Sequence, residues 1–132
     1  MVDLMQMRAL LLVGLGGGIG AVARFTLGSL IGHYWPTSFP LATLVINIIG
    51  SIAMGVFIGL LAKFLPPWQE AARLFVAVGV LGGFTTFSAF SLETVLMLER
   101  GELLAAGGYV LLSVVVCVIG LYLGLLVIRG VA

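Results

Sequence analysis

Long runs of apolar residues, separated by short polar segments, make up most of the chain. Four of these runs contain no charged residue: Ala9–Ala23, Leu41–Ala62, Leu74–Leu92 and Leu103–Ile128. A helix needs about 20 apolar residues to cross the hydrocarbon core of a bilayer, and the first run, which is shorter, resumes after Arg24. The pattern predicts an all-α integral membrane protein with four transmembrane helices, in one domain that covers residues 1–132.

Proline, aromatic and charged residues mark the ends of the predicted helices. Pro66 and Pro67 stop the second helix, and the aromatic residues nearby suit the interface between lipid and water. We expect helices at about Met5–Gly32, Leu41–Phe64, Gln69–Leu98 and Leu103–Arg129.

The third predicted helix contains a segment that suits a continuous helix poorly. Gly82–Thr86 includes two adjacent glycines and two β-branched threonines, and these residue types weaken a helix. Backbone groups left unpaired in hydrocarbon are tolerated only where they face protein, water or a bound ion. We therefore expect this helix to break at mid-membrane depth and to form a site there.

Composition and motifs argue against several classes of function. The chain is 62% hydrophobic and 8% charged with a net charge of +1, which gives no support to a nucleic-acid partner. Gly16–Ala21 contains G-x-G-x-x-A, but a dinucleotide site also needs a preceding strand and an aqueous crevice. The chain has one histidine and neither a G-x-S-x-G nor an H-E-x-x-H motif. We expect no enzyme activity.

Small residues at intervals of four predict where helices touch. They recur on the first helix at Gly16, Gly20, Gly28 and Gly32, and on the second at Ser51, Gly55 and Gly59. This spacing lets membrane helices approach closely.

The basic residues orient the chain only weakly. With four helices, Arg8, Lys63, Arg73 and Arg129 fall on the side of the termini, against Arg100 and Arg24 on the other. This small positive-inside bias allows insertion in both directions, and opposite insertions allow an antiparallel dimer.

Two polar stripes run along the second and fourth helices. Spacing of four places Thr43, Asn47 and Ser51 on one face, and Tyr109, Ser113 and Cys117 on another. A carboxamide within the bilayer must form hydrogen bonds. An interhelical bond would explain a lone asparagine, whereas a three-residue stripe favours a lined pathway.

Aromatic and charged residues near the break suggest which ion would use such a pathway. Phe87 and Phe90 share a helical face, and a phenyl ring has a positive edge that an anion can approach. Arg24 either draws anions into a vestibule or extends to the headgroups. Glu93 either anchors polar groups or carries protons. Amide, hydroxyl and ring edges, rather than carboxylates, favour an anion pathway.

Three segments resemble the Fluc (CrcB) family of fluoride channels. The run Gly82-Gly83-Phe84-Thr85-Thr86-Phe87-Ser88-Ala89-Phe90-Ser91-x-Glu93 is similar to the signature of that family. Gly20-Ala21-x-Ala23-Arg24 and Asn47 with Gly50 resemble its first- and second-helix motifs. The resemblance covers essentially the whole chain. It implies passive fluoride export across the inner membrane by a multi-pass, dual-topology homodimer of antiparallel subunits, with two pores along the subunit boundary.

The resemblance also implies roles for individual residues. Asn47 would donate an N–H to fluoride, and Phe87 and Phe90 would offer ring edges. The polar track would include Thr43, Ser88, Tyr109 and Ser113, with Arg24 at a vestibule and Glu93 in support. The carbonyls of Gly82 and Thr85, from both subunits, would hold a structural sodium ion. Two positions depart from the family pattern, since Ala89 replaces a frequent threonine and Cys117 a frequent hydroxyl residue.

Two alternatives lie outside the channel class. A small multidrug exporter also has four helices and dual topology, but it needs a carboxylate in the first helix, and this chain has none between Asp3 and Glu70. A non-conducting assembly subunit would explain the glycine faces, but not Asn47 together with a broken third helix.

Overall fold

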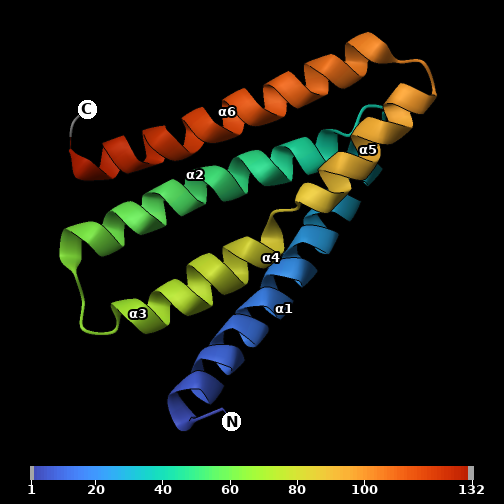
Figure 1. Cartoon of the computed structure of the whole chain (residues 1–132). Coiled ribbons are helices and arrows are strands. Elements are labelled where there is room, and N and C mark those ends of the chain that lie inside the picture. The colour runs from blue at the N-terminus through green and yellow to red at the C-terminus, as the bar shows by residue number, and fades with distance from the viewer. Residues whose placement is uncertain (1, 131–132) are drawn as a thin grey trace.

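The computed structural model describes residues 2–130, and every regular element in that range is a helix. Figure 1 shows the chain as long helices that run back and forth along one direction, with short connections at the two ends. The elements in order are α1 (Leu4–Tyr34), α2 (Leu41–Phe64), α3 (Gln69–Ala72), η1 (Arg73–Leu81), α4 (Gly82–Phe84), α5 (Phe87–Glu99) and α6 (Leu103–Arg129).

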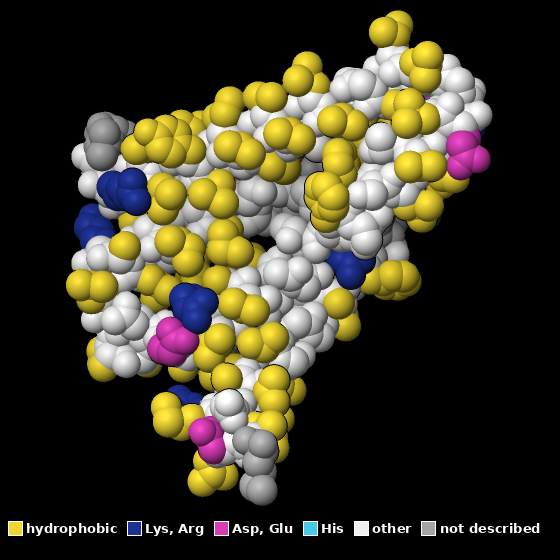
Figure 2. Space-filling model, viewed as in Figure 1, with side chains coloured by type: hydrophobic (Ala, Val, Ile, Leu, Met, Phe, Trp, Pro, Cys, Tyr) yellow, Lys and Arg dark blue, Asp and Glu magenta, His cyan; other side chains and the backbone are white. Residues whose placement is uncertain are grey.

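Among the described residues, four segments are long and apolar enough to cross a membrane. They are Leu4–Tyr34, Leu41–Phe64, Gln69–Glu99 and Leu103–Arg129, and the third of them comprises α3, η1, α4 and α5. Large apolar side chains such as Leu4 and Leu104 are 89% and 94% exposed. Figure 2 shows hydrophobic side chains spread over the visible face, with few charged ones. Such a surface suits lipid better than water.

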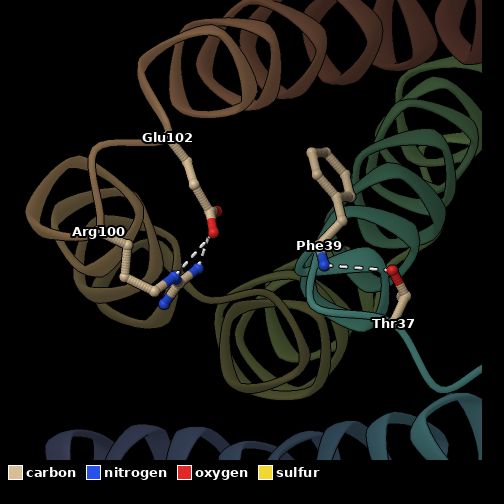
Figure 3. A network of polar contacts seen from close by, with 4 residues as sticks. All are labelled: Thr37, Phe39, Arg100 and Glu102. Carbon is tan, nitrogen blue, oxygen red and sulfur yellow. Dashed lines mark hydrogen bonds and ion pairs between the residues drawn. The ribbon is translucent and has the colours of Figure 1, made fainter.

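The connections gather at opposite ends of the molecule. Both termini and the α2–α3 turn lie toward one end, while the α1–α2 loop and the α5–α6 turn lie toward the other (Figure 1). At the first end, the ammonium of Lys63 donates to the carbonyl of Ile128 at 3.2 Å. At the second end, Arg100 Nε and Nη2 donate to the Glu102 carboxylate at 3.1 and 3.2 Å (Figure 3). These hydrogen bonds hold the pKa of Glu102 below its usual value.

Glycines let α1 pack directly against the backbone of η1 and α4. A Cβ atom at Gly16 would overlap the carbonyl oxygen of Phe75, and one at Gly20 would overlap that of Val80. The predicted spacing therefore marks a true contact at these two positions. It does not at Gly32, where a Cβ would meet nothing within 4 Å, because Gly32 lies on the exposed side of α1 next to the buried Ile31.

A second close contact joins α2 to α6. A Cβ at Gly55 would overlap the carbonyl of Leu121, and one at Gly124 would lie 2.9 Å from the carbonyl of Ile52. Both glycines thus bring backbone against backbone, as small residues do between membrane helices. The two glycine contacts pair α2 with α6, and α1 with η1 and α4, while α5 contacts α6.

The third segment differs from an ordinary α-helix before its interruption. Residues Arg73–Leu81 form a π-helix of nine residues, where the sequence predicts only continuous helix. Short π-helical turns are frequent near functional sites. Gly79 in this element lies against Gly16, because its Cβ would come within 2.9 Å of the Gly16 Cα atom.

Candidate functional site

Two extended residues interrupt the third membrane segment. Helix α4 ends at Phe84, Thr85 and Thr86 have ψ angles of 157° and 116°, and α5 begins at Phe87. The interruption lies inside the segment expected from the sequence but is narrower, since Gly82 and Gly83 remain helical. Gly83 serves a close approach instead, because a Cβ there would crowd the carbonyl of Gly17 in α1.

The side chain of Asn47 pairs with both backbone groups of Thr86. The N–H of Thr86 donates to Asn47 Oδ1 at 2.9 Å, and Asn47 Nδ2 donates to the Thr86 carbonyl at 3.1 Å. A helix end without such partners would leave polar groups unpaired in an apolar environment. The carboxamide of Asn47 therefore stabilises the break, and its second N–H has no acceptor within residues 2–130.

Threonine hydroxyl groups satisfy other groups at the break. The Thr86 hydroxyl accepts from the N–H of Ala89 at 3.1 Å and so caps α5. The Thr85 hydroxyl donates back to the Leu81 carbonyl at 3.0 Å. Ser88 lies beside this cap, with its hydroxyl oxygen 3.3 Å from that of Thr86. Threonine is a favoured N-cap residue because its oxygen accepts from the first turn of the helix.

The end of α4 leaves several carbonyl groups without their usual helical donors. In a continuous helix the carbonyls of Gly82 and Thr85 would accept from the N–H groups of Thr86 and Ala89. Those two N–H groups are bonded to Asn47 Oδ1 and to the Thr86 hydroxyl. The Gly82 and Thr85 carbonyls are therefore free of helical partners.

Arg24 reaches the same helix end from α1. Its Nε donates to the carbonyl of Gly83 at 3.2 Å. A cation is favourable at this point because the carboxyl end of a helix carries partial negative charge. The guanidinium is thus held at the break. It lines a cavity of about 280 Å³ that Thr43, Thr86 and Ala89 also line.

A larger cavity of about 380 Å³ lies on the other side of Thr86. Its lining joins α2, the break, α5 and α6, and none of its described lining residues is charged. The polar and aromatic residues among them are Asn47, Ser51, Thr85, Thr86, Phe87, Phe90, Ser113 and Cys117. The structure thus brings two residues from each predicted polar stripe, and both phenylalanines, around one space, while Thr43 lines the smaller cavity.

The hydroxyl group of Ser113 is the most informative polar group of the larger cavity. Ser113 is only 7% exposed, and its Oγ has no hydrogen-bond partner among residues 2–130. A buried hydroxyl normally has a partner, because leaving it unpaired costs about 1–3 kcal/mol. An occupant that accepts a hydrogen bond would satisfy it.

The two phenylalanines differ in their environment. Phe87 is 77% exposed, whereas Phe90 is 8% exposed, and their ring centroids lie 5.4 Å apart. Phe90 also lies 5.0 Å from the ring of Tyr109. The rings therefore run from the open surface of this chain into its core.

Tyr109 and Glu93 lie together but line neither cavity. The Tyr109 side chain is fully buried, and its hydroxyl donates to Glu93 Oε1 at 3.4 Å. Two of the fourth-helix stripe residues, Ser113 and Cys117, line the larger cavity. Tyr109 lies one turn further along α6, toward the α5–α6 turn.

Sequence reasoning alone missed two residues of the site. Thr86 lines both cavities and caps α5. A threonine directly before a helix is a known N-cap signal, and this signal could have identified Thr86. Gly50 lines the larger cavity, and a Cβ there would overlap the Thr85 methyl group. The sequence marks Gly50 only through the resemblance of Asn47 with Gly50 to a family motif, which gives this glycine no role.

Comparison with known proteins identifies a family and several relatives of this chain. Residues 11–125 match the family described as "CrcB-like protein, Camphor Resistance (CrcB)". A protein of Rhodospirillum centenum named "Fluoride-specific ion channel FluC" is 50% identical over 123 residues, which cover 93% of this chain and 97% of that protein. A protein of the same name from Novosphingobium aromaticivorans is 52% identical over 128 residues, covering 96% of this chain and 100% of the relative.

The pairing between Asn47 and Thr86 predicts a specific loss of stability. We expect Asn47→Ala to lower the free energy of unfolding by about 1–3 kcal/mol for each Thr86 backbone group that is left unpaired. Thermal denaturation in detergent, followed by circular dichroism, measures the change.

Ser51→Ala is the matched control for this experiment. Ser51 lies one turn from Asn47 and lines the same cavity, but its side chain makes no hydrogen bond within residues 2–130. Equal melting temperatures for Asn47→Ala and Ser51→Ala would show that the carboxamide does not stabilise the break.

Proposed function

This chain belongs to the CrcB-like protein family and is a multi-pass membrane protein, and we propose that it is a fluoride-selective channel. The channel lets fluoride leave the cell passively and so lowers its cytoplasmic concentration. The unpartnered, buried hydroxyl of Ser113, in an uncharged cavity that also holds Asn47 and the phenylalanines, is the observation that carries the proposal. The printed names of the relatives support the choice of ion.

The chemistry of the larger cavity suits fluoride. Fluoride holds its hydration shell tightly, so its passage requires replacement donors at close range. Ser113 offers a hydroxyl, Asn47 keeps one free N–H, and Phe87 and Phe90 offer positive ring edges. None of the described lining residues is a carboxylate, which disfavours a cation. Neutral donors also bind an anion weakly enough to release it.

The smaller cavity serves as the vestibule of this pathway. Arg24 supplies the positive charge that raises the local concentration of anions. Thr86 lines both cavities, so an anion that passes its hydroxyl moves from a charged space into a neutral one. Thr43 belongs to the vestibule, Ser88 lies beside the Thr86 hydroxyl, and Tyr109 and Glu93 support the track further along α5 and α6.

The functional unit is a dual-topology homodimer of two antiparallel copies in the inner membrane. Phe87 lines the larger cavity yet is 77% exposed in a single chain. A second copy against this face would complete the wall and exclude lipid. The small excess of basic residues at one end is compatible with insertion in both directions.

A structural sodium ion joins the two copies at their break segments. The Gly82 and Thr85 carbonyls have lost their helical donors, and oxygen ligands suit a hard monovalent cation. One chain offers two carbonyls, which is too few to replace a hydration shell, and two copies together offer four. The Gly83 carbonyl between them is excluded from this set because it accepts from Arg24.

Fluoride efflux from liposomes tests the function. We expect purified protein reconstituted into liposomes to release fluoride quickly, measured with a fluoride electrode, while chloride release stays at the level of empty liposomes. Equal release of both ions would contradict selectivity. Silence for both ions from a well-folded dimer would favour the assembly subunit instead.

Phe87→Ile tests the ring edge at the surface of the cavity. Loss of the contact between fluoride and the Phe87 ring edge should lower fluoride flux about two- to tenfold. The variant should stay folded, because Phe87 is largely exposed in the single chain. Phe64→Ile is the matched control, since Phe64 is 67% exposed and lines neither cavity. Flux from Phe87→Ile equal to that of the control would remove Phe87 from the pathway.

Removal of sodium tests the structural ion. In buffer where N-methylglucamine replaces sodium, we expect a lower melting temperature of the dimer and a lower flux, both restored when sodium returns. Without sodium, the Gly82 and Thr85 carbonyl oxygens of the two copies would face one another with no cation between them, which would destabilise the dimer. A dimer that is equally stable in both buffers would contradict the sodium site.

A further inference from the structure

Four aromatic rings form a continuous line from α5 through α6 to the loop before α2. Phe87 and Phe90 have ring centroids 5.4 Å apart, and Phe90 and Tyr109 have centroids 5.0 Å apart. The line then continues to Phe39, whose ring meets that of Tyr109 at 5.5 Å with an interplanar angle of 83°. Phe39 lies outside the motifs that point to the pathway, and it lines neither cavity.

The loop before α2 holds Phe39 in a fixed place. The N–H of Phe39 donates to the Thr37 hydroxyl at 3.2 Å, and the Phe39 carbonyl accepts from Leu41 at 2.7 Å. Pro40 follows directly and restricts the backbone of the residue before it. Figure 3 shows the Phe39 ring standing away from Thr37 and toward α6. The ring is half-buried and packs against the core that contains Tyr109.

Ring packing, rather than hydrogen bonding, orients Tyr109. Its hydroxyl lies 3.4 Å from Glu93 Oε1, which is long for an O–H···O bond, where about 2.7–2.8 Å is usual. The ring itself is fully buried between Phe39 and Phe90. The ring is therefore held on two sides, while its hydroxyl makes one long hydrogen bond to the Glu93 carboxylate.

We propose that Phe39 is a positioning residue of the fluoride pathway, which acts by fixing the ring of Tyr109 so that its hydroxyl stays directed at the Glu93 carboxylate beside the polar track. The inference rests on the proposed function. Its physical basis is the edge-to-face contact, which is the preferred arrangement of two aromatic rings. Phe39 itself touches no ion.

Ring dynamics test the proposal without any reference to transport. Protein labelled with fluorotyrosine should show, by fluorine NMR, slowly exchanging signals for the ring of Tyr109, identified by their disappearance in Tyr109→Phe. We expect these signals to merge in Phe39→Leu, because the ring then flips freely, and to stay separate in Phe39→Tyr. Unchanged signals in Phe39→Leu would overturn the proposal, whether or not the protein conducts fluoride.

Fluoride flux measurements test whether the position of the Tyr109 ring affects conduction. We expect Phe39→Leu to lower fluoride flux about two- to tenfold and Phe39→Tyr to retain the wild-type rate. Tyr34→Leu is the control for this measurement. The Tyr34 ring is exposed, lies near the same loop and contacts only the rings of His33 and Trp35 among the described residues, so this variant should also conduct normally.

A double variant separates positioning from general damage. When Tyr109→Phe has removed the hydroxyl and lowered the flux, adding Phe39→Leu should cause no further loss, since both changes act on the same group. Fully additive losses, or a wild-type flux from Tyr109→Phe, would overturn the proposal. Absence of flux from the wild type would instead contradict the channel function, and the NMR result would still decide the role of Phe39.

Discussion

The pairing of Asn47 with the peptide of Thr86 is the interaction on which the rest of the site depends. A helix can end and restart in an apolar environment only if the backbone groups at the break find partners. Asn47 satisfies both groups of Thr86 from a different helix, and the Thr86 hydroxyl then caps α5. As a consequence, carbonyls at the end of α4 become available, and α5 starts at an angle that lets Phe87 and Phe90 reach the larger cavity.

Close glycine contacts make this pairing geometrically possible. Gly20 and Gly83 let α1 lie against η1 and α4, and this contact puts Arg24 within reach of the Gly83 carbonyl. On the other side, Gly55 lets α2 lie against α6, which brings Ser113 to the same cavity as Asn47. The cavity exists because four segments pack on either side of one break. A single added methyl group at these positions would push the walls apart.

Charge is separated from the neutral donors in a way that suits conduction. The guanidinium of Arg24 lines the smaller cavity, while the described residues of the larger one carry no charge. A full positive charge inside a narrow apolar pathway would hold an anion too strongly for it to leave. In the proposed channel, a charge in the smaller cavity and neutral donors in the larger one would attract an anion without trapping it.

Local features of the sequence determined the membrane segments and the position of the break. The length of an apolar run and the helix-weakening residues at 82–86 depend on neighbours along the chain, and the observed segment bounds agree with the expected ones to within a few residues. Packing between distant segments decided the rest. Asn47 and Thr86 are 39 residues apart, so no spacing could reveal that the carboxamide pairs with the Thr86 backbone. For the same reason, only the tertiary structure shows that Gly83 allows a close approach rather than breaking the helix. It alone also shows that Arg24 and Ser113 line separate cavities, and that the Phe39 ring packs against Tyr109.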